Sequence, residues 1–223
     1  ITRFIPSVPG YVYAFDDDGV YVNLYMSNDA SVIRDNDTIY ISQYTGYPWD
    51  GRVNITLNPR KETEMAIKLR IPGWARGEAI DGDLYFFDNS DIPEFSLTVN
   101  GKKANYRMEK GYAVIEGTWS KGDRISLDLP MDVLRLHADE RIEADQGLTA
   151  FQRGPLVYAA EWADNDEGRA LNLLLDSDEK PTSGFEPGLM EGTQTIKLSG
   201  KADRSYSEEG FIMQVPTEIK LIP

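Results

Sequence analysis

One stretch constrains the fold of this chain more than any other: Glu64–Ala75, which reads EMAIKLRIPGWA. Every second residue from Met65 to Ile71 is a large aliphatic residue, and Lys68 lies between them. A period of two places the aliphatic side chains on one face of a β-strand and the charged side chains on the other. We expect the strand to end at Pro72-Gly73, because proline donates no N–H and glycine permits a sharp turn. Trp74 then follows the strand, where it either covers the core or faces a neighbouring domain.

Shorter alternating segments recur along the first half of the chain, separated by turn residues. Asp16–Gly19 is predicted to be a hairpin turn, after which Val20, Val22, Leu24 and Met26 form one face of the second strand. Turn signals at intervals of about 8–12 residues are typical of a β-sandwich. The strands predicted before Pro130 are Tyr11–Phe15, Val20–Met26, Thr38–Gln43, Val53–Leu57, Met65–Ile71, Phe95–Val99, Tyr112–Gly117 and Arg124–Leu129. Asn100-Gly101 is the strongest local signal for a hairpin.

The pattern becomes less regular after Pro130. The strands predicted there are Met131–Leu136, Arg141–Asp145, Thr149–Glu161 with a break at Gly154-Pro155, Gln194–Leu198, Phe211–Val215 and Glu218–Ile222. The polar segments predicted to be loops are Gly77–Asp91, Ala163–Gly168 and Asp176–Gly188.

We therefore expect an all-β chain, an antiparallel β-sandwich with two sandwich-like domains or layers. Residues 1–9 form a lead-in, 10–130 the first β-sandwich, and 131–223 a second, smaller β domain whose last strand can return to the first.

Composition excludes several classes of function. The chain has 37 acidic and 23 basic residues, and its net charge of −14 repels nucleic acids and anionic membrane surfaces. The absence of cysteine excludes disulfides, thiolate metal sites and a cysteine nucleophile within this chain. No apolar run approaches the roughly 18 residues that a membrane-spanning helix needs. We expect neither a nucleic acid nor a membrane as a partner.

Two candidate chemistries are weak on sequence grounds. His137 is the only histidine, and no Gly-x-Ser-x-Gly motif supplies a nucleophile for it, so a structural or surface role is favoured. The acidic segments Asp164–Gly168 and Asp16–Gly19 resemble the start of a calcium loop. The first has Arg169 in place of the turn glycine and Leu175 in place of the bidentate glutamate. A solvated loop is the favoured interpretation of both segments.

An aromatic loop is the better candidate for a binding site. Tyr44, Tyr47 and Trp49 lie beside Asp50, and together with Trp74 they could form a platform on which the C–H faces of a sugar stack. The alternative, which we favour, is that these large amphipathic side chains pack the end of the sandwich or a domain interface.

Six motifs, in this order, resemble one family. They are GVYVNLYMS (Gly19–Ser27), YPWDG (Tyr47–Gly51), KLRIPGWA (Lys68–Ala75), LTVNGK (Leu97–Lys102), WSKGDRISLDLPM (Trp119–Met131) and FQRGPLVYAAE (Phe151–Glu161). The ordered set resembles the C-terminal part of glycoside hydrolase family 127, the β-L-arabinofuranosidase-like proteins. The resemblance covers most of residues 1–161.

The resemblance implies an N-terminal (α/α)6 barrel followed by β-sandwich domains. It places a zinc-bound cysteine nucleophile and an acid/base glutamate in the barrel, with the cysteine pair a few residues before the segment that resembles Ile1–Phe4. No residue of this chain matches those catalytic positions, so we predict no catalytic residue, no metal site and no cofactor here, with zinc expected only in the barrel.

The favoured interpretation is a non-catalytic β-sandwich portion of a glycoside hydrolase that supports its own N-terminal barrel. The alternative is an autonomous carbohydrate-binding module that uses the Tyr44–Trp49 loop and binds a glycan. The family's substrates suggest a periplasmic or secreted bacterial protein.

Overall fold

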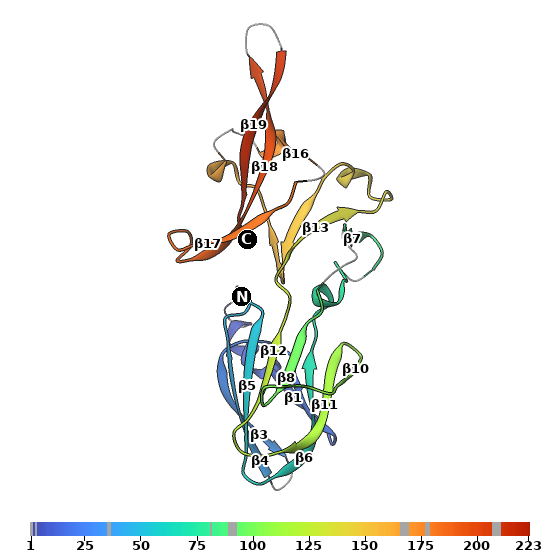
Figure 1. Cartoon of the computed structure of the whole chain (residues 1–223), viewed down its shortest axis with the longest axis vertical. Helices are drawn as coiled ribbons and strands as arrows, with labels where there is room; N and C mark the ends of the chain where they lie inside the picture. Colours follow the sequence, from blue (N-terminus) through green and yellow to red (C-terminus); the bar gives the residue numbers. More distant parts are fainter. Residues whose placement is uncertain are drawn as a thin grey trace. The chain divides into compact units, whose positions relative to one another are not determined.

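The computed structural model describes residues 2, 4–34, 37–80, 82–88, 93–165, 170–176, 179–206 and 211–223. The chain divides into two compact units (Figure 1). The first comprises Ile1–Asp81 and Ser90–Met131, and the second comprises Gly82–Asn89 and Asp132–Pro223. The domain boundaries expected from the sequence stay a prediction, but the excursion of residues 82–89 into the second unit was not anticipated. Within the described residues, no helix is both long enough and apolar enough to cross a membrane.

The first unit contains a five-stranded and a six-stranded sheet. The strands of the first sheet, in spatial order, are β1 (Tyr13–Phe15), β2 (Gly19–Val22), β6 (Thr63–Arg70), β11 (Tyr112–Trp119) and β10 (Arg107–Glu109). Those of the second are β3 (Asn28–Arg34), β4 (Asp37–Thr45), β5 (Arg52–Pro59), β12 (Asp123–Asp128), β8 (Ser96–Val99) and β9 (Lys102–Lys103). Two 3-10 helices accompany them, η1 (Ile5–Tyr11) and η2 (Gly73–Arg76).

The core of the first unit follows the alternation of its strands. The inward residues of β5, Val53, Ile55 and Leu57, are fully buried, as are Ile67 and Leu69 of β6. β5 contributes alternate residues to the core, because successive side chains point to opposite faces of a strand, whereas in β6 the intervening Ala66 and Lys68 are buried as well. The strand predicted at Met65–Ile71 is present as β6, and its aliphatic residues are buried as predicted.

Polar contacts join the two sheets of the first unit. The buried side chain of Gln43 in β4 donates from Nε2 to Tyr13 Oη in β1 at 3.3 Å and to the Leu24 carbonyl at 3.3 Å. Asn28, at the start of β3, accepts a hydrogen bond from Tyr13 at 3.1 Å. Sheets linked in this way form the expected β-sandwich.

One pair of neighbouring strands in the first unit is parallel. β2 pairs in parallel with β6, with Val20 opposite Ile67, whereas β1 and β2 form the predicted antiparallel hairpin. The close approach requires Gly19, because a Cβ atom at this position would lie 2.0 Å from the Ala66 carbonyl oxygen. Glycine is used where two backbones come this near.

The second unit also contains two sheets. The first has the order β15 (Leu156–Tyr158), β14 (Ala150–Arg153), β13 (Val133–Ala138) and β7 (Tyr85–Phe87). The second is built on β18 (Thr193–Tyr206), which pairs with β19 (Phe211–Leu221), β17 (Thr182–Glu186) and β16 (Leu173–Leu175). Short 3-10 helices η3 (Glu143–Asp145), η4 (Trp162–Asp164) and η5 (Ala170–Asn172) lie in the connections. Figure 1 shows β18 and β19 as a long twisted pair.

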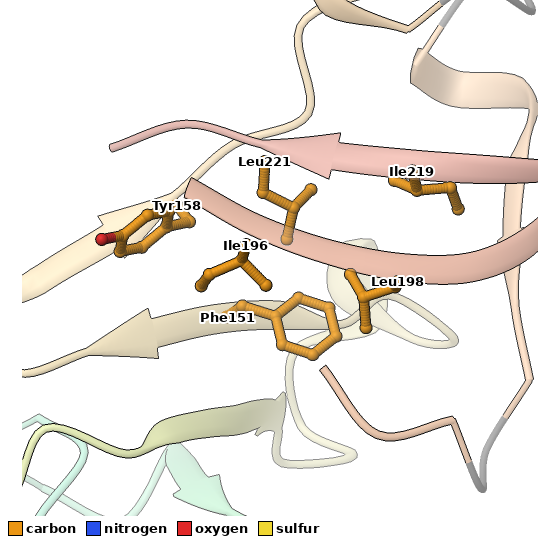
Figure 2. Close-up of a cluster of buried hydrophobic side chains, with 6 residues drawn as sticks. All are labelled: Phe151, Tyr158, Ile196, Leu198, Ile219 and Leu221. Atoms are coloured by element: carbon orange, nitrogen blue, oxygen red, sulfur yellow. The ribbon is translucent and has the colours of Figure 1, made fainter. Parts of the chain in front are cut away.

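The core of the second unit lies between these two sheets. Figure 2 shows its buried side chains gathered together, namely Phe151 of β14, Tyr158 of β15, Ile196 and Leu198 of β18, and Ile219 and Leu221 of β19. The backbones of Ala159 and Ile222 exchange two hydrogen bonds of 2.8 and 3.0 Å. The expectation of an all-β chain with two sandwich-like domains is confirmed. β19 pairs with β18 within the second unit, and the return of the last strand to the first sandwich stays a prediction.

Four local predictions were wrong. β2 ends at Val22, and Met26 is partly exposed and not on the core face. Arg141–Asp145 is not a strand, because Asp139 Oδ1 accepts hydrogen bonds from the backbone and side chain of Arg141 and turns the chain into η3. The predicted loops Gly77–Asp91 and Asp176–Gly188 contain β7 and β17.

Other differences concern segments that the sequence left undivided or unassigned. β3 and β16 were not predicted, and the segments Phe211–Val215 and Glu218–Ile222 form the single strand β19. The lead-in 1–9 includes most of η1, although residues 1 and 3 lie outside the described residues. Most of the candidate calcium loop Asp164–Gly168, residues 166–168, also lies outside them.

Candidate functional site

The aromatic loop between β4 and β5 is held in place by its own hydrogen bonds. Thr45 donates from Oγ1 to the Arg52 carbonyl at 2.7 Å, and its Oγ1 accepts the Tyr47 N–H at 3.0 Å. The Gly46 carbonyl accepts the N–H groups of Trp49 at 2.9 Å and Asp50 at 3.3 Å. The Tyr47-Pro48 peptide bond is cis. These contacts make the loop an ordered turn.

Asp50, predicted as an acid beside a sugar platform, has a structural role in this turn. Its Oδ1 accepts the backbone N–H of Arg52 at 2.8 Å. Its carboxylate also lies against Gly46, where a Cβ atom would come within 2.7 Å of Oδ2. A side chain at position 46 would therefore make the Asp50 carboxylate, which closes the loop, shift.

Two of the predicted aromatic residues pack inward. Trp74, in η2, is only 8% exposed, and Tyr47 is half-buried. Tyr47 packs edge-to-face on Tyr25, with ring centroids 5.9 Å apart, and Tyr25 donates from Oη to the Arg70 carbonyl at 2.5 Å. Edge-to-face packing is a preferred geometry for aromatic pairs. These residues pack the end of β6, which is the alternative that we favoured for them.

The pKa shifts of the tyrosine hydroxyls agree with this packing. Burial raises the pKa of the Tyr47 hydroxyl, and a hydrogen bond with Trp74 opposes that rise. Burial also raises the pKa of Tyr25 far above its ordinary value. A phenol that is hard to ionise is a structural donor, because desolvation disfavours its charged form. This cluster carries no acid or base suited to catalysis near neutral pH.

The other two aromatic residues of the loop are exposed. Tyr44 is 76% exposed at the end of β4, and Trp49 is 40% exposed in the turn. The structure thus does not bring Tyr44, Tyr47, Trp49, Asp50 and Trp74 onto one open platform, since Tyr47 and Trp74 are turned into the packing. A contact with carbohydrate at this loop stays a prediction.

Sequence reasoning missed the two residues that organise this cluster. The sequence analysis places Val20, Val22, Leu24 and Met26 on one face of a strand and gives Tyr25 no role. The ladder ends at Val22, so the alternation no longer decides which way Tyr25 points. The only available signal was the aromatic residue itself, since a tyrosine next to an aliphatic strand is often buried with a hydrogen-bond partner. Its partner, the Arg70 carbonyl, gave no signal.

His137 has a local partner in the second unit. Its Nε2 lies 2.9 Å from Asp88 Oδ1, and its ring is 6.3 Å from that of Phe86 on the paired strand β7. Arg135 approaches the other oxygen of Asp88 at 3.8 Å. The histidine thus holds the end of β7. Among the described residues, no cluster of three or more histidine, aspartate or glutamate side chains could hold a metal ion.

An apolar surface lies at the N-terminal end of the first unit. Phe4, Ile5 and Tyr11, which lie on or next to η1, are 65%, 62% and 60% exposed, and no residue of η1 is buried. We call these three residues the N-terminal apolar surface. A run of large apolar side chains left in water is unfavourable, and such a patch commonly marks a contact site.

Comparison with known proteins identifies relatives along the whole chain. Residues 19–131 match the family model described as the middle domain of GH127 β-L-arabinofuranosidase, and residues 133–223 match that of the glycoside hydrolase family 127 C-terminal domain. The non-reducing end β-L-arabinofuranosidase of Bifidobacterium longum subsp. longum is 32% identical over 216 residues, which cover 94% of this chain and 30% of that protein.

Two solved structures share the fold. A GH127 β-arabinofuranosidase has 38% sequence identity and a TM-score of 0.93, over all of this chain and 34% of that one. A GH127 β-L-arabinofuranosidase from Geobacillus stearothermophilus T6 has 32% identity and a TM-score of 0.80, over 98% of this chain and 33% of that one. The chain therefore spans about a third of the length of the relatives that it matches.

Proposed function

Because this chain belongs to glycoside hydrolase family 127, of which it contains the middle and C-terminal domains, we propose that it is the non-catalytic β-sandwich part of a β-L-arabinofuranosidase-like enzyme. The family resemblance of the ordered motifs is confirmed by these matches. In this proposal the two units support an N-terminal catalytic domain, and the full enzyme removes arabinofuranose or a related sugar from glycans. The relatives are about three times as long as this chain, which supports an additional domain.

The N-terminal apolar surface carries this proposal. η1 has no buried residue, although its sequence, IPSVPGY, includes isoleucine, valine and tyrosine. Covering a large aliphatic side chain contributes about 1.5–3 kcal/mol, so a domain packed on Ile5 would gain stability from it. We propose that the N-terminal domain covers Phe4, Ile5 and Tyr11, and that this domain is an (α/α)6 barrel.

The chemistry of the chain supports a catalytic centre elsewhere. The resemblance assigns catalysis to a zinc-bound cysteine and a glutamate in the barrel, and this chain has no cysteine and a single histidine. His137 is engaged with Asp88 and has no nucleophile assigned to it. We propose that zinc is bound only by the N-terminal domain and that the 223-residue chain hydrolyses no arabinoside.

Ile5→Asp tests the proposed docking, and Ile33→Asp is its matched control. Ile33, in β3, is 68% exposed against 62% for Ile5, so neither change should destabilise the isolated chain much. In the longer protein that contains the N-terminal domain, Ile5→Asp should lower the melting temperature by several degrees and Ile33→Asp should not.

The same preparations test the inactivity of the chain. Arabinose release from an aryl β-L-arabinofuranoside should be found with the longer protein and should be absent with the 223-residue chain. Turnover by the isolated chain, or equal effects of the two aspartate substitutions in the longer protein, would contradict the proposal.

A further inference from the structure

Strands β18 and β19 extend beyond the other strands of their sheet (Figure 1). β16 and β17 pair with β18 no further than Ala202, whereas β18 and β19 stay paired as far as Tyr206 and Phe211. We call the last four pairs, from Asp203 with Gln214 to Tyr206 with Phe211, the projecting arm. In the part of the chain that the structure describes, no third strand pairs with this arm. A two-stranded ribbon is at best marginally stable in water, so a further strand beside the arm would stabilise it.

The hydrogen bonds of Lys220 show which backbone groups of β19 point away from β18. The Lys220 N–H donates to Asn165 Oδ1 at 2.8 Å, and the Lys220 carbonyl accepts a hydrogen bond from Asn165 Nδ2 at 3.0 Å. In an antiparallel ladder the direction of these groups alternates from residue to residue. The register between β18 and β19 is unbroken, so Ile212 and Gln214 also direct their N–H and C=O groups away from β18.

This outward edge of β19 is open along the arm. Among the described residues, no strand pairs with it, so the N–H and C=O groups of Ile212 and Gln214 are left to solvent. The next outward position on the edge is Pro216. Proline within a sheet is tolerated where its missing N–H would face solvent, which agrees with an edge that is open in the isolated chain.

The side chains of the edge lack the usual protection against pairing. The segment Phe211–Thr217, which reads FIMQVPT, has no charged residue, although 27% of the residues of the chain are charged. Ile212 is 67% exposed and Met213 is 53% exposed. Edge strands that stay unpaired commonly carry charged side chains, lysine above all. An uncharged edge with exposed apolar side chains is therefore suited to pairing.

We propose that the outward edge of β19 pairs with the same edge of a second copy of this chain, antiparallel, about a twofold axis at Met213. Ile212 of each copy then lies opposite Gln214 of the other, and each such pair exchanges two backbone hydrogen bonds. A register centred on Gln214 would place Pro216 opposite Ile212 and lose a hydrogen bond in each pair. The register centred on Met213 leaves Pro216 outside the paired residues 211–215.

Charge favours a second copy over a basic partner. Each copy has a net charge of −14, so two copies can meet only where neither presents acidic side chains, and residues 211–217 have none. A basic partner would be attracted to acidic side chains, which this segment does not offer. In the proposed register the two Met213 residues form a non-hydrogen-bonded pair, in which side chains come closest, and each covers the exposed side chain of the other.

Sedimentation velocity of the 223-residue chain tests for the second copy. We expect a reversible monomer–dimer equilibrium with a Kd on the order of 100 µM in about 0.3 M NaCl, because the interface is small and salt screens the repulsion between the copies. Met213→Lys places two ammonium groups opposite each other and should weaken association about tenfold or more. Ile33→Lys makes the same change of charge at a residue of β3 that is 68% exposed, and should leave association unchanged.

Amide exchange followed by ¹⁵N NMR locates the contact. Between about 20 µM and about 1 mM protein, exchange of the Ile212 and Gln214 amides should slow several-fold, because their N–H groups become bonded in the dimer. Glu218 lies on the same outward side of β19 but outside residues 211–215, so its amide is the control and should exchange at the same rate at both concentrations.

Gln214→Pro separates pairing from folding. It removes an outward N–H from each copy without removing a hydrogen bond to β18, so it should weaken association and leave the melting temperature unchanged. The proposal is overturned if the chain stays monomeric up to about 1 mM, if Ile33→Lys weakens association as much as Met213→Lys, if the dimer survives both β19 variants, or if it forms without protecting the Ile212 and Gln214 amides. The Ile5 docking test concerns the longer protein and is independent of these outcomes.

Discussion

Phe87→Ala should destabilise the second unit. Along the sequence, however, residues of the first unit both precede and follow the segment that contains Phe87. Phe87 belongs to β7, is 9% exposed, and lies opposite Leu136 of β13. The strand is held further by the Asp88 N–H, which donates to the Arg135 carbonyl at 3.0 Å, and by Tyr85 Oη, which donates to Asp145 Oδ2 at 3.0 Å.

The expected loss follows from the burial of this ring. Truncating a fully buried phenylalanine to alanine costs about 3–5 kcal/mol, and the residual exposure of Phe87 places it at the lower end, at about 3 kcal/mol. Phe86, the preceding residue on the same strand, points to the other face and is 50% exposed. Phe86→Ala is therefore a matched control, with an expected cost of less than about 1 kcal/mol.

Native-state hydrogen exchange followed by mass spectrometry is the appropriate assay, because it reports on each unit separately. Phe87→Ala should accelerate exchange of the slowest amides in β13 and β14 roughly 100-fold, which is the equivalent of about 3 kcal/mol. Amides of β5 and β6 should exchange as in the original chain. If β5 and β6 lose protection instead, or if Phe86→Ala has the same effect as Phe87→Ala, the assignment of β7 to the second unit is refuted.

Two further predictions concern polar contacts of the first unit. Hydrogen bonds from Tyr21 and Lys68 hold the pKa of Asp16 well below its ordinary value, so its contribution to stability is present above an unfolded pKa of about 3.9 and is lost as the pH falls below it. Asp16→Asn should therefore reduce the drop in urea midpoint between pH 7 and pH 3, and an unchanged drop would contradict this mechanism. Tyr25→Phe should cost about 1–2 kcal/mol in urea unfolding, because it leaves the Arg70 carbonyl without the 2.5 Å hydrogen bond. No loss of stability would show that water replaces the phenol.

In the candidate site, the residues of a single sequence motif differ in burial and in role. YPWDG was predicted as one unit, either a sugar platform or a packed end. In the structure, Tyr47 packs inward and Asp50 accepts a hydrogen bond that closes the turn. Trp49 is partly exposed. Sequence spacing could not separate these roles, because the direction of each side chain depends on the turn geometry.

The sequence by itself determined the strands whose alternation is regular and the turns between them. Met65, Ile67 and Leu69 lie on the buried face as their spacing predicts, and the Asn100-Gly101 turn joins β8 to β9 with positive φ at both residues. These features are local: the twofold period and the preferences of Asn-Gly act within a few residues.

Only the tertiary structure decided which sheet each strand joins. β7 lies within a segment whose sequence is polar and Gly-bearing, and it becomes a strand because β13, some fifty positions further along the chain, offers it a free edge. Tyr25 is buried because the end of β6 provides the Arg70 carbonyl. Pairing between strands that are far apart in the sequence produces no periodic pattern in the sequence. The paired strands are brought together by the burial and backbone hydrogen bonding of the whole unit.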